Sequence, residues 1–240
     1  MQIITEAIIA VFLLFIWKFA VKESFINLGL TRKNRWKDLI LGLFIGAFSI
    51  FFVYEILILT DQLSISSIDF SIILTPKYIL YIFLYIVVGF YEELLSRGFI
   101  VHFLKRTRNI YAIILISSVI FSLLHIFNQN VVLLGLLNIF IVGILFALML
   151  YKRGSLWMPI GFHITWNFFQ GNVLGLNVSG NESYSIINNS IFGNNLLTGG
   201  NFGAEGGIAT TFIIGILVIV FLILKKKDDP NLWSIKLSKN

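Results

Sequence analysis

The stretch YILYIFLYIVVGFYEELLSRGFIVHF, residues 78–103, is long and apolar enough to cross a bilayer. It nevertheless contains two adjacent glutamates, Glu92 and Glu93, and an arginine, Arg97. Carboxylates inside hydrocarbon are costly and persist when they have a partner or a task. This cluster is therefore the first candidate for chemistry, and the span around it indicates a membrane protein.

The composition of the 240-residue chain supports this interpretation, because 58% of its residues are hydrophobic, 12% are charged and the mean hydropathy is +0.90. A soluble domain usually carries about twice that share of charge. We expect an all-α fold, a polytopic bundle of about seven transmembrane helices in which residues 1–240 form a single membrane domain. Cysteine is absent, which excludes disulfides and thiolate catalysis.

The expected membrane helices are seven apolar segments, at residues 3–21, 38–60, 78–104, 110–128, 131–151, 157–171 and 208–224. Of the 18 Lys and Arg residues, 15 fall in one alternating set of loops and in the C-terminal tail. Positive charge collects in cytoplasmic loops, so the N-terminus is predicted outside and the C-terminus in the cytoplasm. The same pattern explains the net charge of +6 without a nucleic-acid partner. We expect a multi-pass protein of the cell membrane, of bacterial type, with the lipid bilayer around it.

Residues 172–207 form an Asn- and Gly-rich segment without Lys or Arg, which we expect to be an extracytoplasmic loop. Its two Gly-rich runs, GLNVSG and LTGGNFGAEGG, favour turns. Two interpretations stay open for a loop of this length, a flexible connector or a segment that folds back over a functional site. Ser179 in the first run has no histidine near it in sequence and is interpreted as a turn residue.

Two further polar motifs occur in separate apolar segments. Phe121 begins FSLLH, whose last residue is His125, and His163 begins HITWN, whose last residue is Asn167. Residues four apart share a helix face, so His163 and Asn167 are expected to lie together. A lone buried histidine is usually structural. Two histidines together with an amide and a carboxylate, spread over three apolar segments, favour a functional site.

The two glutamates have different expected surroundings. Glu93 lies four residues before Arg97 and is within ion-pair reach on one helix face, which is typical of a structural ion pair. Glu92 is rotated by about 100° and has no partner nearby in sequence. Its carboxyl is either kept protonated by burial or poised as a general base, and the sequence does not separate these two interpretations.

Several other hydrolytic chemistries find no support in the sequence. It has no HExxH motif, no GxSxG motif and no pair of aspartates inside the expected spans. The remaining set of one glutamate, two histidines and an asparagine suits activation of a water molecule, with an amide to stabilise a developing oxyanion.

The motifs EExxxR, FxxxH and HxxxN, in this order and on separate apolar segments, resemble those of the CPBP family. This family contains CAAX prenyl endopeptidases and bacteriocin-processing or self-immunity membrane proteins, also called the Abi family. The stretch GSLWMPIGFHITWNFFQG and the Gly-rich LTGGNFGAEGG are also similar to segments of the family. The resemblance covers about residues 78–207, the expected catalytic core. Ser96 is a small departure, because an apolar or aromatic residue is common before the arginine.

The resemblance implies an intramembrane glutamic endopeptidase without a cofactor or metal. Glu92 would be the base that activates water, and His125 would help to position that water. His163 and Asn167 would stabilise the oxyanion.

Three more residues are implied to support this set: Glu93 and Arg97, which would brace the helix, and Phe121. The implied partner is a peptide or protein substrate within or at the membrane. The bacterial character of the chain argues against a prenylated substrate.

Two alternatives stay open beside this interpretation. One is a non-catalytic self-immunity or scaffold protein, although such a protein would be expected to lose at least one motif residue. The other is a zinc metalloprotease with Glu92, His125 and His163 as ligands, since these residue types bind zinc.

Overall fold

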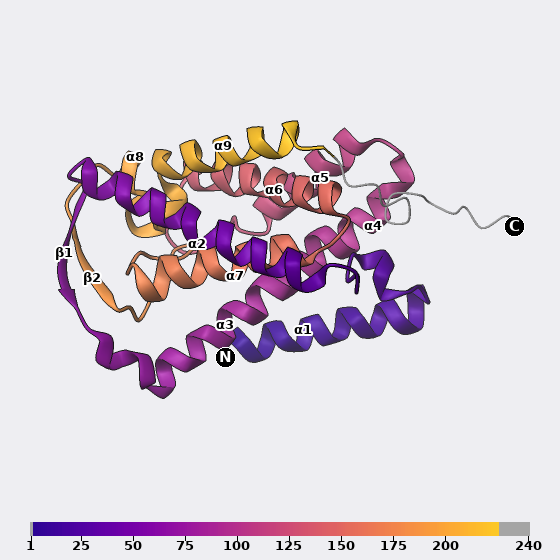
Figure 1. Ribbon diagram of the computed structural model, residues 1–240, viewed down its shortest axis with the longest axis horizontal. Coiled ribbons are helices and arrows are strands. Elements are labelled where there is room, and N and C mark those ends of the chain that lie inside the picture. Colours follow the sequence, from indigo (N-terminus) through magenta and orange to yellow (C-terminus); the bar gives the residue numbers. More distant parts are fainter. Residues whose placement is uncertain (1, 226–240) are drawn as a thin grey trace, which may run out of the picture.

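The computed structural model describes residues 2–225 (Figure 1). Within them the chain is helical apart from one two-stranded sheet, so the expected all-α class is confirmed with the sheet as an addition. The tail lysines 226, 227, 236 and 239, part of the charge argument above, lie outside the described residues.

Each expected apolar segment corresponds to a helix or to consecutive helical segments. These are α1 (Gln2–Ile16) continued by the π-helical turn Trp17–Val21, α2 (Arg35–Leu59), α3 (Pro76–Glu93) continued by the π-helical segment Leu94–Ile100 and α4 (Val101–Leu104), α5 (Ile110–Leu123), α6 (Leu133–Arg153), α7 (Trp157–Phe168) continued by Phe169–Val173, and α9 (Ile208–Ile223). Among the described residues, four helical runs are long and apolar enough to cross a membrane. They begin at Gln2, Arg35, Pro76 and Leu133. The chain therefore has the helices of a multi-pass membrane protein, and seven spans stays a prediction.

Local sequence signals fix the ends of the helices that carry the candidate residues. The Thr75 hydroxyl accepts a hydrogen bond from the Tyr78 amide, and Pro76 follows at the first helical position of α3. The Asn109 side chain caps α5 in the same way. Because α5 ends at Leu123, His125 lies in the turn after the helix, and the expectation of a helix through residue 128 is wrong.

Helix α7 lies directly against α2 because glycines let the two backbones approach. A Cβ atom at Gly42 would lie 2.0 Å from the Met158 carbonyl oxygen, and one at Gly46 would lie 2.3 Å from the Phe162 carbonyl oxygen. These two glycines form a GxxxG pair, a spacing that allows close helix packing in membranes. Thr165 of α7 also donates a hydrogen bond of 2.7 Å to the Leu43 carbonyl of α2. The helix that bears His163 and Asn167 is thereby held in place.

The segment 172–207 is tied to the bundle by a sheet that the sequence did not predict. Strand β1 (Leu63–Ile68) pairs in antiparallel fashion with β2 (Ile187–Ile191). The Tyr54 hydroxyl and the Asn189 side chain add a hydrogen bond of 2.7 Å between α2 and β2. The structure therefore favours the folded loop over the flexible connector.

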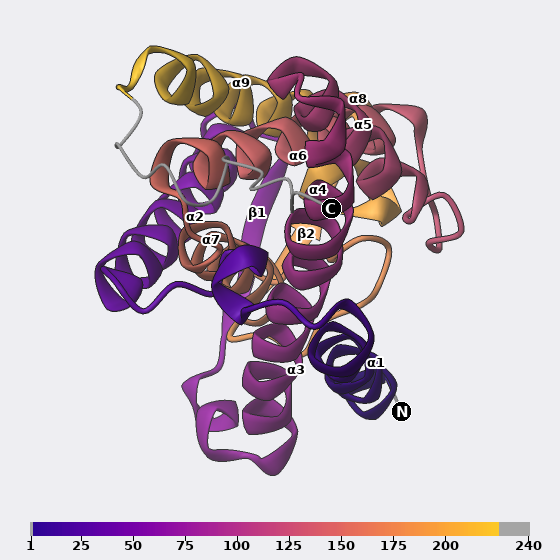
Figure 2. The ribbon, with the colours of Figure 1, turned by 90° about the vertical axis from the view of Figure 1, so that its right-hand side faces the viewer.

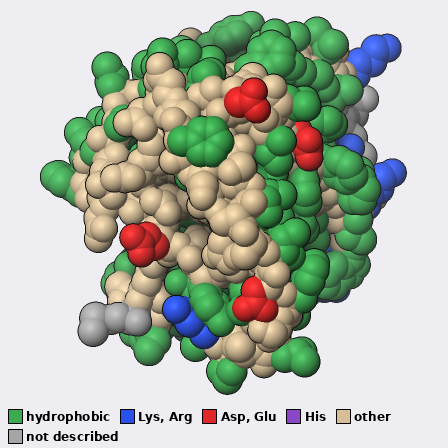
Figure 3. Space-filling view, turned by 90° about the vertical axis from the view of Figure 1, so that its left-hand side faces the viewer, with side chains coloured by type: hydrophobic (Ala, Val, Ile, Leu, Met, Phe, Trp, Pro, Cys, Tyr) green, Lys and Arg blue, Asp and Glu red, His purple; other side chains and the backbone are tan. Residues whose placement is uncertain are grey.

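The basic connectors gather at the end of the bundle opposite this sheet (Figures 1 and 2). Arg153 at the end of α6 pairs with Asp38 near the start of α2, and Lys105 donates to the Asn27 carbonyl. Figure 3 looks onto the sheet end, where acidic side chains are scattered over a polar surface. The two ends of the bundle thus differ in charge as the loop pattern indicated.

The orientation of these two ends in the membrane can be tested with single cysteines, because the chain has none of its own. Asn188 on β2 and Lys33 before α2 are both exposed. The positive-inside pattern predicts that an impermeant thiol reagent labels Asn188→Cys in intact cells and does not label Lys33→Cys. Both should be labelled after the membrane is opened, and the inverse result in intact cells would reverse the orientation.

Candidate active site

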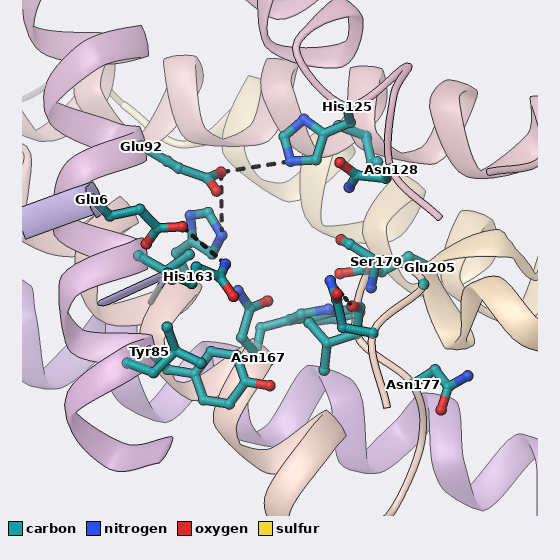
Figure 4. A pocket seen from close by; sticks show the side chains of 18 of the residues that line it. Glu6, Tyr85, Glu92, His125, Asn128, His163, Asn167, Asn177, Ser179 and Glu205 are labelled. Carbon is teal, nitrogen blue, oxygen red and sulfur yellow. Dashed lines mark hydrogen bonds and ion pairs between the residues drawn. The ribbon is translucent and has the colours of Figure 1, made fainter. Parts of the chain in front are cut away.

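A cavity of about 1000 Å³ lies between the helices and the Asn- and Gly-rich loop (Figure 4). Its walls come from α1, α3 and the π-helical segment after it, the end of α5 and the turn that follows, α6, α7 and the start of α9. Two parts of the loop, residues 177–182 and 201–205, complete the lining. Cavities of this size hold small ligands or a few residues of a peptide. Five of the predicted site residues line it: Glu92, Phe121, His125, His163 and Asn167.

Both predicted histidines face Glu92. Its Oε2 atom lies 3.6 Å from His125 Nε2 and 3.9 Å from His163 Nε2. The three residues come from α3, the turn after α5, and α7. The sequence motifs therefore converge on one carboxylate oxygen in the lining of the cavity.

The other nitrogen of each imidazole fixes the orientation of its ring. His125 Nδ1 lies 2.8 Å from the Phe121 carbonyl oxygen, and His163 Nδ1 lies 3.3 Å from Glu93 Oε1. Because both partners are acceptors, each Nδ1 carries the proton that is donated. Nε2 of each ring is consequently the atom that faces Glu92.

Glu93 and Arg97 form the expected ion pair. The distance from Arg97 Nη1 to Glu93 Oε1 is 3.1 Å, and both side chains are fully buried. Arg97 also donates to the Gly143 carbonyl at 3.2 Å, and its guanidinium lies 4.0 Å from the centre of the Phe121 ring. The pair thus joins α3 to α5 and α6, and Phe121 belongs to it as well as to the cavity wall.

Asn167 lies one helical turn after His163 and points into the cavity (Figure 4). Only 6% of the residue is exposed. No hydrogen bond joins its side chain to any other described residue. A buried amide without a protein partner is unusual and points to a ligand group as its partner.

Three acidic residues in the lining of this cavity, Glu6, Glu182 and Glu205, were not among the predicted site residues. Glu6 of α1 lines it and falls within the expected span 3–21, so an acidic residue in an apolar segment was an available signal. Glu205 comes from the second Gly-rich run, for which a fold over a functional site was one of the two open interpretations. Ser179 is a turn residue as expected, with φ of 48°, and its hydroxyl also donates to Glu205 at 2.8 Å.

The residue types at the centre of the site are those that bind zinc. Within residues 2–225, however, no group of three His, Asp or Glu side chains meets the geometry of a metal site.

The comparisons with known proteins match one part of the chain. Residues 74–169 match the family described as type II CAAX prenyl endopeptidase, Rce1-like. No curated protein and no solved structure matches the chain. The matched segment contains all seven predicted site residues, whereas Glu6, Ser179 and Glu205 lie outside it. This match supports the resemblance found in the sequence, and residues 74–169 are similar to the CAAX protease family.

Proposed function

We propose that this protein is an intramembrane endopeptidase in which Glu92 and His125 activate the attacking water. The observation that carries this proposal is the meeting of Glu92 Oε2 with two oriented imidazole Nε2 atoms at the wall of a peptide-sized cavity. The match of residues 74–169 to an endopeptidase family supports it independently.

The reaction begins with a water molecule held between Glu92 and His125. Glu92 takes one proton from the water while the water oxygen attacks the carbonyl carbon of the peptide bond. The tetrahedral oxyanion that forms accepts a hydrogen bond from the Asn167 amide, beside the ring of His163. As the carbon–nitrogen bond breaks, the proton held by Glu92 passes to the leaving amine, which restores the carboxylate.

The residues behind the site keep this geometry without touching the substrate. Glu93 holds the His163 ring by its Nδ1 atom and is itself held by Arg97. The Phe121 carbonyl likewise holds the His125 ring by its Nδ1 atom. The arrangement disfavours the non-catalytic alternative, since a scaffold protein has no need for two oriented imidazoles around one carboxylate.

The role of Asn167 gives a direct test of this mechanism. An oxyanion donor acts on the transition state more than on the bound substrate, so Asn167→Ala should lower kcat by about 10²–10³ with little change in KM. Asn167→Asp should be no better, because a carboxylate repels the developing charge. Turnover is measured on a peptide reporter in liposomes, with Asn188→Ala on the exposed strand β2 as the matched control.

Near-normal turnover in Asn167→Ala would remove the oxyanion role from this residue. If His125→Ala were also near normal, both positions would be structural, and the non-catalytic alternative would become the better interpretation.

A further inference from the structure

The cavity contains more acidic residues than water activation requires. Its lining contains four acidic residues, Glu6, Glu92, Glu182 and Glu205, two histidines, His125 and His163, and one residue of the Lys or Arg type, Lys77. Lys77 lies over the Tyr184 ring at 4.5 Å from the centroid. Glu92 has two imidazoles beside it, whereas no described Lys or Arg forms an ion pair with Glu6 or Glu205. Among residues 2–225, Glu6 and Glu205 therefore have no Lys or Arg partner, and the positive groups that act on them are the imidazoles of His163 and, for Glu205, also His125.

Glu205 is held firmly on one wall of the cavity. Its Oε2 atom accepts hydrogen bonds from the Ser179 amide at 2.7 Å and from the Ser179 hydroxyl at 2.8 Å. Its backbone carbonyl accepts a hydrogen bond of 2.7 Å from Asn138 of α6. Within the described residues, its other carboxyl oxygen has no hydrogen-bond partner. Burial raises the pKa of Glu205, against the lowering effect of the Ser179 hydrogen bonds.

Glu6 lies on the opposite side of the site. Figure 4 shows it on the α1 side of His163 and Asn167, with Glu205 across the cavity. The Oε1 atom of Glu6 accepts a hydrogen bond of 2.9 Å from the Gln2 side chain. Its Oε2 atom is buried and has no hydrogen-bond partner within the described residues.

The unpartnered amide of Asn167 between these two carboxylates shows that the space is built for a ligand. A peptide carbonyl satisfies that amide, but it leaves Glu205 and Glu6 without a Lys or Arg partner. Carboxylates removed from bulk water are stabilised by an opposite charge at hydrogen-bond distance. A ligand that satisfies the whole cavity therefore presents a carbonyl to Asn167 and a cation to a neighbouring carboxylate.

We propose that the substrate carries a basic side chain, arginine or lysine, near the cleaved bond, and that Glu205 binds it with Glu6 on the opposite wall. This inference rests on the proposed function, because it names the class of peptide that the proposed peptidase accepts. Glu205 and Glu6 both lie outside the segment that matches the endopeptidase family, so this preference belongs to this chain's own loop and first helix.

Binding can be measured without cleavage, which separates this inference from the proposed function. The probes are fluorescent apolar peptides that carry one arginine at successive positions, each paired with a peptide that has citrulline there instead. Citrulline keeps the shape of arginine and removes its charge. Binding to the Glu92→Gln protein in liposomes, with a chelator present, should favour arginine by about tenfold or more at one position.

The variants assign the preference to a residue. Glu205→Gln should reduce the ratio of arginine to citrulline affinity to near one, Glu205→Asp should retain part of it, and Glu205→Arg should favour a glutamate peptide. Asp61→Asn, which removes an exposed carboxylate of the turn after α2 outside the cavity lining, is the matched control and should keep the full ratio. Near-UV circular dichroism of each variant shows whether it is folded.

Two outcomes would overturn the inference: equal affinity for arginine and citrulline peptides at every position, or a preference that folded Glu205→Gln and Glu205→Arg proteins both retain. A preference for arginine in binding, combined with no cleavage of the same peptides by the wild-type protein, would instead contradict the proposed function and leave the cationic site standing.

Discussion

Glu93→Gln is expected to lower the free energy of unfolding by about 3–5 kcal/mol, because it leaves the fully buried guanidinium of Arg97 without its counter-charge. The Gly143 carbonyl and the Phe121 ring still contact Arg97, but neither supplies a negative charge. The change is measured by thermal and denaturant unfolding in detergent. Asp61→Asn, at an exposed position in the turn after α2, is the control and should stay within about 0.5 kcal/mol of the wild-type protein.

A second substitution shows whether the pair is the cause of this loss. Combining Glu93→Gln with Arg97→Met removes the uncompensated charge and keeps an apolar side chain in the same space, so part of the stability should return. If the single and double variants were equally unstable, the loss would come from another contact of Glu93, of which His163 is the first candidate.

In contrast to Glu93→Gln, Glu92→Gln is expected to abolish activity while the protein stays stably folded. Removing a general base costs about 10²–10⁴ in rate, and an uncharged amide is easier to bury than a carboxylate. The side chain of Glu92 is 22% exposed toward the cavity, and Glu92 takes no part in the Glu93–Arg97 pair. Turnover of the reporter and the unfolding midpoint are measured on the same preparation. Retained turnover would exclude Glu92 as the base, and a loss of stability equal to that of Glu93→Gln would make it structural.

The sequence was sufficient to predict which residues meet at the centre of the site, because its motifs specify residue types at helical spacing. Glu93 and Arg97 pair as their spacing predicts, and His163 and Asn167 share a face of α7. The Glu93–His163 contact was not predictable, because it depends on how α3 and α7 are rotated against each other. Glu93 was predicted only to brace the helix, and the structure adds its contact with the His163 ring.

The parts that the sequence missed depend on long-range pairing. Strand β1 has an apolar and serine-rich sequence of six residues that pairs with an asparagine-rich partner more than 100 residues away. Glu205 enters the cavity because Asn138 and Ser179 hold a glycine-rich turn, and glycine-rich sequence alone does not indicate where a turn packs. Glu6 was detectable as an acidic residue in an apolar span, but its position opposite Glu205 was not.

Activity after removal of metal is the most direct test of glutamate-based water activation. Purified protein in liposomes is treated with a strong chelator, analysed for bound zinc, and assayed on the reporter beside Glu92→Gln. We expect the metal-free wild-type protein to keep its full turnover and Glu92→Gln to have none above background. Stoichiometric zinc, with turnover lost on chelation and restored by zinc alone, would contradict it and establish Glu92, His125 and His163 as metal ligands.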